Sequence, residues 1–270
     1  MGLGSVLSWL PAQEPRRPDA FLTALSEDVE ATERVTVIMA MNADGTNVRT
    51  VGAIPGYPII NSPEVSPDGG WIGVDGWKYG ESLVDAHLLL IHLKTGIVSD
   101  LGIGAMPTWS ADGRFLAYSR YGTGGGSRGV FIGSVNQERE RLIDENGWAI
   151  TWSPDGQKLV YVKNADLIVY DVVFGTRHSV FGAGKSPYRR VMHNPEWSPD
   201  SSRVCILGVR SDGSRELATV QAEGSDPDLQ VCCNAQGFNP DIGWSKDGRW
   251  LSIPKGAADG SPGQIFVVDL

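Results

Sequence analysis

Apolar residues in this chain gather in short runs, and stretches rich in Gly, Pro and polar residues separate the runs. Residues 115–118 and 159–161 are two such runs. Runs of this length between turn residues are typical of β-strands, because a helix shows a longer segment with a period near 3.6 residues. The pattern therefore predicts an all-β chain of many short strands.

One turn phrase recurs along the chain: Trp or Val, then Ser, usually Pro, Asp and usually Gly. The five copies are Val65-Ser66-Pro67-Asp68-Gly69, Trp109-Ser110-Ala111-Asp112-Gly113, Trp152-Ser153-Pro154-Asp155-Gly156, Trp197-Ser198-Pro199-Asp200-Ser201 and Trp244-Ser245-Lys246-Asp247-Gly248. The serines lie 43 to 47 residues apart. Self-similarity at this period indicates a propeller or another repeat array.

The chemistry of the phrase is that of a tight turn between two strands. Pro presets the first turn dihedral, Asp bonds backbone N–H groups just after it, and Gly accepts a positive φ. The Trp before the turn is a large apolar body that we expect to pack between neighbouring sheets. The turn role accounts for all five Asp residues, so we interpret them as structural.

Ser201 stands where the other copies have Gly. If this position needs a positive φ, Ser201 costs about 1 kcal/mol there. The sequence therefore predicts that Ser201→Gly stabilises the protein.

The phrase, with the Asp-Gly hairpin at residues 41–49, resembles the TolB-like, WD-like β-propeller repeat over residues 34–270. The resemblance implies four-stranded antiparallel blades, and we favour a six-bladed plan with an incomplete blade. Such repeats occur in periplasmic TolB, in the lids of prolyl-oligopeptidase-like enzymes and in some sugar lyases. The resemblance therefore implies a fold more than a function.

Five repeats can be counted in the sequence. The expected strands do not divide into complete blades for either a five-bladed or a six-bladed ring. We expect third strands at residues 35–41, 87–93, 130–135, 167–172, 217–221 and 265–270, and fourth strands such as 139–143 and 229–233. If both termini complete the last blade, residues 48–51 are its outer strand. The chain could also be a fragment of a longer protein.

Residues 1–33 lack the repeat and form an N-terminal extension before the propeller of residues 34–270. Phe21, Leu22, Leu25 and Val29 have a helix-like spacing after Pro18. This spacing predicts a short helix within residues 19–33, with a linker as the alternative.

The net charge of −9 argues against a nucleic-acid partner, and no apolar run reaches the length needed for membrane insertion. The first ten residues lack the positive charge of a secretion signal. Cys205, Cys232 and Cys233 are interpreted as free thiols. We expect a cytoplasmic protein, or a periplasmic or extracellular one if the true N-terminus is missing.

Candidate catalytic motifs occur in the sequence, but the neighbouring elements or residues that each of them needs are missing. The Gly-rich residues 122–129 match a dinucleotide pattern and a nucleophile-elbow pattern, but a strand follows instead of the required helix. His193, just before a phrase, resembles a residue of oligogalacturonate-lyase-like propellers, where several such residues bind a metal in the central channel. The other repeats supply no second His there, so we predict no metal, no cofactor and no catalytic residue.

Irregular loops on one face are the expected binding surface, because variable loops on a rigid scaffold usually carry function. Aromatic and Arg residues are enriched in binding hot spots. The candidate binding residues are Trp77, Tyr79, Trp148, Tyr188, Arg189, Arg190, His193, Asn194, Phe238 and Asn239. The alternative for the aromatic ones is that they cover the core.

The sequence thus predicts a monomeric, non-catalytic propeller that binds a protein or peptide, with an acidic partner favoured by the Arg residues. One alternative is a carbohydrate-active lyase-like or hydrolase-like enzyme with His193, Arg190 and Asn194 near its central channel. Another is the propeller part of a larger peptidase or sensor.

Overall fold

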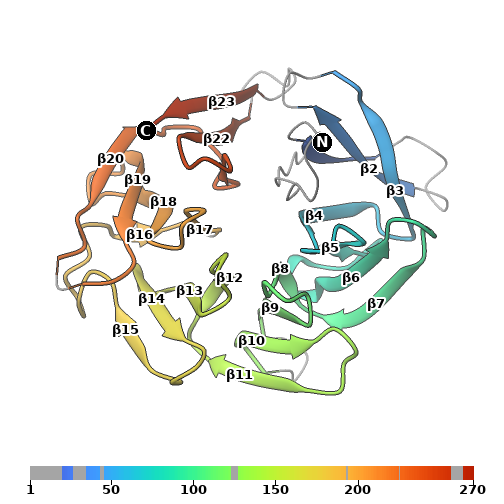
Figure 1. Cartoon of the computed structure of the whole chain (residues 1–270), viewed down its shortest axis with the longest axis horizontal. Helices are drawn as coiled ribbons and strands as arrows, with labels where there is room; N and C mark the ends of the chain where they lie inside the picture. Colours follow the sequence, from blue (N-terminus) through green and yellow to red (C-terminus); the bar gives the residue numbers. More distant parts are fainter. Residues whose placement is uncertain are drawn as a thin grey trace. The chain divides into compact units, whose positions relative to one another are not determined.

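The computed structural model describes residues 20–26, 35–42, 46–122, 127–192, 194–224, 226–256 and 264–270 (Figure 1). The chain divides into two compact units: unit 1 is Met1–Arg128 with Ile132–Arg141, and unit 2 is Gly129–Phe131 with Leu142–Leu270. Within the described residues, every regular element is a strand except one short 3-10 helix. None of the described segments is a helix long and apolar enough to cross a bilayer.

Unit 1 contains β1 (Ala20–Ser26), β2 (Val35–Asn42), β3 (Arg49–Pro55), β4 (Ile59–Val65), β5 (Trp71–Trp77), η1 (Leu83–Asp85), β6 (His87–His92), β7 (Val98–Ile103), β8 (Ala105–Trp109) and β9 (Phe115–Arg120). The division between the units falls within β10 (Gly129–Ser134) and β11 (Glu140–Asp144). Unit 2 contains β12 (Trp148–Trp152), β13 (Lys158–Lys163), β14 (Asp166–Asp171), β15 (Arg177–Ser179), β16 (Arg190–Val191), β17 (Glu196–Trp197), β18 (Arg203–Val209), β19 (Arg215–Gln221), β20 (Gln230–Asn234), β21 (Gly243–Trp244), β22 (Trp250–Lys255) and β23 (Gln264–Asp269).

The described strands form six sheets in which strands adjacent in the chain pair with one another. They are β1-β2-β3, β4-β5-β6-β7, β8-β9-β10-β11, β12-β13-β14-β15, β16/β17-β18-β19-β20 and β21-β22-β23. The pairing is antiparallel, as in β5 with β6 and β18 with β19. The expected third strands correspond to β2, β6, β10, β14, β19 and β23, and the expected fourth strands to β11 and β20. These predictions are confirmed to within two residues.

The repeated phrase forms the same turn in each copy. The Ser Oγ donates a hydrogen bond of 2.5–2.7 Å to Asp Oδ1 in all five. The same Asp oxygen accepts the backbone N–H two residues later at 2.9–3.1 Å. The four Gly residues have φ between 67° and 74°. The structural role predicted for the five Asp residues is therefore confirmed.

Ser201 has a φ of 60°, so the turn does impose a left-handed backbone on this non-Gly residue. The side chain is also buried, and its Oγ accepts the backbone N–H of Asp155 at 3.1 Å. This bond could not be predicted from the turn motif, and it stabilises Ser201 and partly offsets the strain.

The Trp residues at the start of the repeated phrase pack between sheets, as expected. Trp197 and Trp244 are buried, and their indole Nε1–H groups donate to Thr151 O at 3.2 Å and Glu196 O at 3.3 Å. In unit 1, Trp109 donates to Glu64 O at 3.1 Å. Each indole thus bonds the first strand of the preceding sheet, which fixes how neighbouring sheets stack within a unit.

A β-bulge interrupts the first strand of several sheets. The register shifts between Asn61 and Glu64 in β4, and equivalent shifts occur in β8 and β12. The residues inside these bulges have left-handed backbones: Ser62, Met106 and Ala149, with φ of 49–54°. Asn194, with a φ of 60°, lies between β16 and β17, which both pair with β18.

In the N-terminal part, the expected helix is wrong, and the alternative that residues 48–51 complete the last blade does not hold. Residues 20–26 form β1, not a helix, and each pairs with a residue of β2. Pairing supplies partners for the backbone groups along the edge of β2, whereas a helix this short is unstable alone. Residues 49–55 form β3, which pairs with β2 and does not complete the last sheet.

Candidate functional site

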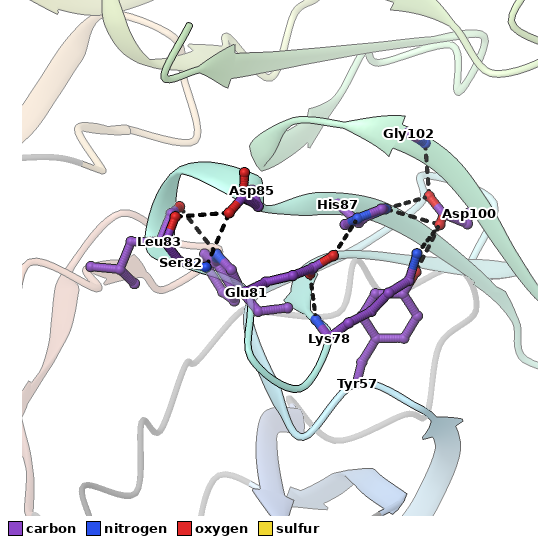
Figure 2. A network of polar contacts seen from close by, with 10 residues as sticks. Tyr57, Lys78, Glu81, Ser82, Leu83, Asp85, His87, Asp100 and Gly102 are labelled. Atoms are coloured by element: carbon purple, nitrogen blue, oxygen red, sulfur yellow. Dashed lines mark hydrogen bonds and ion pairs between the residues drawn. The ribbon is translucent and has the colours of Figure 1, made fainter. Parts of the chain in front are cut away.

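The segment between β5 and β6, residues 78–86, is the first candidate; we call it the 78–86 loop (Figure 2). Local hydrogen bonds hold its backbone. The indole Nε1–H of Trp77 donates to Leu83 O at 3.1 Å, and Lys78 N donates to Glu81 Oε2 at 2.6 Å. Ser82 N and Ser82 Oγ donate to Asp85 Oδ2 at 3.0 and 2.8 Å and cap η1.

His87, the first residue of β6, links this loop to β7 (Figure 2). Its Nε2 lies 3.3 Å from Glu81 Oε1, and its Nδ1 lies 2.9 Å from Asp100 Oδ2. Asp100 also accepts the Tyr57 hydroxyl at 2.7 Å and the Gly102 N–H at 2.8 Å. Both sides of the imidazole therefore face a carboxylate.

Asp100 is stabilised as the anion. Burial alone raises its pKa, but hydrogen bonds from Tyr57, Gly102 and His87 outweigh burial and leave the pKa lowered. Burial and the bond to Asp100 raise the pKa of Tyr57, so Tyr57 stays neutral.

The loop presents two large side chains to solvent. Tyr79 is 78% exposed and Leu83 is 69% exposed. Tyr79 is therefore placed where the sequence predicted, whereas Trp77 is only 5% exposed. The expectation of an exposed Trp77 is wrong because its ring forms the support of the loop, with its N–H bonded to Leu83 O.

The second candidate lies in unit 2, where β16 and β19 begin and β18 ends. Arg190 pairs with Val209, and Val209 pairs with Arg215. Directly opposed residues in antiparallel strands point to the same face, so Arg190 and Arg215 flank Val209 about 10 Å apart. Arg189 precedes β16, and its N–H donates to Val209 O at 2.9 Å. We call Arg189, Arg190 and Arg215 the arginine end.

The nearby carboxylate Glu216 lies on the opposite face of this sheet. It accepts the Tyr188 hydroxyl at 2.7 Å and Arg210 NH2 at 2.6 Å. Tyr188 is only 4% exposed, so the expectation of an exposed ring here is also wrong. Its ring covers Gly208, where an added Cβ would lie 2.3 Å from it. Burial, followed by the bond to Glu216, raises the pKa of Tyr188.

The other predicted site residues lie elsewhere in unit 2. Asn194 donates to Asp241 Oδ1 at 2.8 Å, and Phe238 packs edge-on against Phe266 at 5.1 Å with Lys255 Nζ over both rings. Asn239 is exposed, and Trp148 is partly buried at the start of β12. His193 lies outside the described residues. The structure thus brings Arg189 and Arg190 together with Arg215 and leaves the rest as local contacts.

Four groups of a Tyr, a carboxylate and a basic side chain recur along the chain and look catalytic at first sight. They are Tyr57–Asp100–His87, Tyr118–Glu140–Arg120, Tyr161–Asp144–Lys163 and Tyr188–Glu216–Arg210. The recurrence of the same combination indicates a structural role, because each carboxylate already contacts both a Tyr hydroxyl and a basic side chain. Among the described residues, no group of three or more His, Cys, Asp or Glu is placed to hold a metal ion.

Two carboxyls have raised pKa values. Desolvation raises the pKa of Glu64 to about 7 despite hydrogen bonds from Trp109 N and Thr108 Oγ1. Desolvation likewise raises the pKa of Asp241 to about 6 against the bond from Asn194. These bonds join neighbouring chain segments, which accounts for both carboxyls as structural groups.

Sequence reasoning missed Leu83, Arg215 and the His87 network. Leu83 and His87 belong to a loop whose backbone path no periodicity reveals. Arg215 joins Arg190 only through the strand register, which a single sequence does not specify.

Comparison with protein-family models finds no match, and comparison with curated proteins finds none either. Solved structures are similar in fold. TolB from Acinetobacter baumannii has a TM-score of 0.72 and 13% identity, covering 92% of this chain and 60% of that one. A putative TolB from Agrobacterium tumefaciens has a TM-score of 0.71 and 19% identity, covering 89% and 86%. An oligogalacturonate lyase in complex with manganese has a TM-score of 0.57 and 13% identity, covering 91% and 81%.

These likenesses concern the fold alone. With the repeated sheets, they show an all-β propeller of antiparallel blades, as the turn phrase predicted. The chain spans less than two thirds of the length of the Acinetobacter TolB, at 60%.

Proposed function

We propose that this propeller is a non-catalytic scaffold that binds a protein or peptide, and that the arginine end receives acidic side chains of that partner. One observation supports the proposal above the others. Among the described residues, no carboxylate lies within ion-pair distance of Arg189, Arg190 or Arg215, although the chain carries a net charge of −9.

Most other cations of unit 2 are neutralised by a neighbour. The paired residues are Lys158, Lys163, Arg177, Arg203, Arg210 and Arg249. Three arginines on adjoining segments of an acidic chain, none with a carboxylate partner among the described residues, would create a local positive field that attracts carboxylates. Their planar forks bind carboxylates in a bidentate manner, and Arg is enriched in binding hot spots.

The strands that hold the arginine end are rigid. β18 pairs with β16 and along its whole length with β19, and Val209 between the two arginines is buried. A binding group on such a support loses little backbone entropy when a partner binds. Tyr79 and Leu83 of unit 1 are a separate pair of exposed hydrophobic residues.

We also infer a six-bladed plan in which the two three-stranded sheets are incomplete blades. The six sheets and the likeness to TolB structures support this plan. The monomeric state remains a prediction, and sedimentation equilibrium tests it.

The test of the binding function uses fluorescent peptides of acidic, neutral and basic composition and measures anisotropy. We expect the acidic peptide to bind wild type and to lose about tenfold or more in affinity with Arg189→Ser/Arg190→Ser. Lys94→Ser/Lys246→Ser changes the net charge equally at two exposed positions and serves as the matched control. Equal losses in both variants, or no binding by wild type, contradict the proposal.

A further inference from the structure

The 78–86 loop also contacts His87 through Glu81, and this contact is not needed to expose Tyr79 and Leu83. Only one side chain of the loop, Glu81, bonds the imidazole of His87, while the other ring nitrogen bonds Asp100 in β7. Glu81 also accepts the N–H of Lys78 with its second oxygen. Glu81 therefore couples the start of the loop to the strand at its end (Figure 2).

The proton count at His87 decides whether both links can exist. An imidazolium has two N–H donors and serves Glu81 and Asp100 together, whereas a neutral imidazole has one. The nitrogen without a proton then turns a lone pair toward a carboxylate. The contact to Asp100 is 2.9 Å and that to Glu81 is 3.3 Å, so the single proton of the neutral form stays with Asp100.

Ionisable groups from three segments face His87. The loop supplies Lys78, Glu81 and Asp85, β7 supplies Asp100, and the segment before β4 supplies Tyr57. Lys78 Nζ lies 3.6 Å from Asp100 Oδ2 and over the Tyr57 ring. Three carboxylates and one ammonium thus lie around the imidazole. The Tyr57 ring packs edge-on against His87 at 5.7 Å and keeps it in place in either state.

We propose that His87 is a protonation-dependent clamp, which fixes the 78–86 loop and its exposed Tyr79 and Leu83 at acidic pH and loosens the loop as pH rises. This inference concerns unit 1 alone and does not depend on an acidic partner at the arginine end. The geometry carries the proposal, because an imidazole between two carboxylates can donate to both only when both of its ring nitrogens hold a proton.

Hydrogen exchange of the Lys78 amide tests the clamp without any partner, because Glu81 is its acceptor. We expect its protection factor, corrected for intrinsic exchange, to fall about tenfold or more from about pH 5.5 to 8, as a charge-assisted bond is lost. In His87→Gln the protection factor should not change with pH. His92→Gln, at the other end of β6, is the matched control and should behave as wild type.

A second variant keeps the clamp testable if His87→Gln does not fold. Glu81→Gln keeps His87 and Asp100 and an oxygen that can accept the Lys78 N–H, but it removes the loop carboxylate, so the protection of the Lys78 amide should no longer depend on pH. The clamp is overturned if wild type shows the same corrected protection at both pH values. It is overturned equally if His87→Gln keeps the wild-type pH dependence.

Discussion

The 78–86 loop and the arginine end are two ways of presenting side chains from the same kind of sheet. The loop is an irregular segment whose charges are used internally: Lys78, Glu81, Asp85 and His87 all have partners within unit 1. The large hydrophobic side chains that it exposes are Tyr79 and Leu83. The arginine end is regular backbone whose positive charges have no partner among the described residues.

This difference shows how a repeated scaffold can separate stability from recognition. In the 78–86 loop, polar groups bond one another and two large hydrophobic side chains are exposed. At the arginine end, Tyr188 and Val209 are packed in the interior, and the arginines have no carboxylate partner among the described residues. The two regions should therefore respond in opposite ways to steric and electrostatic perturbation.

The largest expected effect is steric and falls under the arginine end. Gly208→Ala places a Cβ 2.3 Å from the Tyr188 ring, and the ring is tied to Glu216 by its hydroxyl. We expect a loss of about 3 kcal/mol in the free energy of unfolding, measured by urea titration. Gly76→Ala, at the base of the loop, meets side chains only at 3.0–3.1 Å and should cost about 1 kcal/mol. Equal losses in the two variants would remove the contrast in packing.

An electrostatic change should act on the loop instead. Asp100→Asn removes the anion that accepts bonds from Tyr57, Gly102 and His87. We expect a loss of about 1.5 kcal/mol at neutral pH, a value kept small because Asp100 is partly exposed.

The pH dependence of this loss has a defined sign. The pKa of Asp100 is lowered in the folded protein. The ionised carboxylate therefore adds to the free energy of unfolding above the ordinary pKa of Asp, and this stabilisation is lost as pH falls through the pKa of the folded protein. Wild type and Asp100→Asn should converge in stability at strongly acidic pH. Glu138→Gln, at an exposed position, is the control and should follow wild type. A difference that persists at low pH would indicate that Asp100 acts by packing.

The smallest effect concerns Ser201, in the turn that precedes β18. Ser201→Ala removes the acceptor of the Asp155 N–H without relieving the positive φ, and it should cost about 1 kcal/mol. Ser201→Gly relieves the strain and loses the same bond, so the stabilisation predicted from the sequence should shrink to within about 0.5 kcal/mol of zero. Thermal unfolding of both variants measures the balance; a strongly stabilised Gly variant would show that the bond contributes nothing.

The repeated phrase made the propeller fold predictable, because its Ser, Asp and Gly positions specify a turn by local chemistry alone. The positive φ at Ser201 followed from the same chemistry, but its bond to Asp155 did not, since it joins residues of different sheets. Residues 20–26 were misjudged because their spacing suits a helix, while the edge of β2 determines their conformation.

The candidate site was less predictable than the fold. Aromatic type alone did not separate Tyr79, which is exposed, from Trp77 and Tyr188, which support the segments beside them. Exposure depends on the path of each loop, and the meeting of Arg190 with Arg215 depends on strand register. Neither is contained in the local pattern of one sequence.

The most direct test of the contrast is an NMR titration with a short acidic peptide that follows the Arg Nε–H signals and the backbone amides together. We expect shifts for Arg189, Arg190 and Arg215, none for the paired Arg203 and Arg120, and none for the amides of the 78–86 loop. Shifts spread evenly over all Arg signals, or confined to the 78–86 loop, would contradict this expectation.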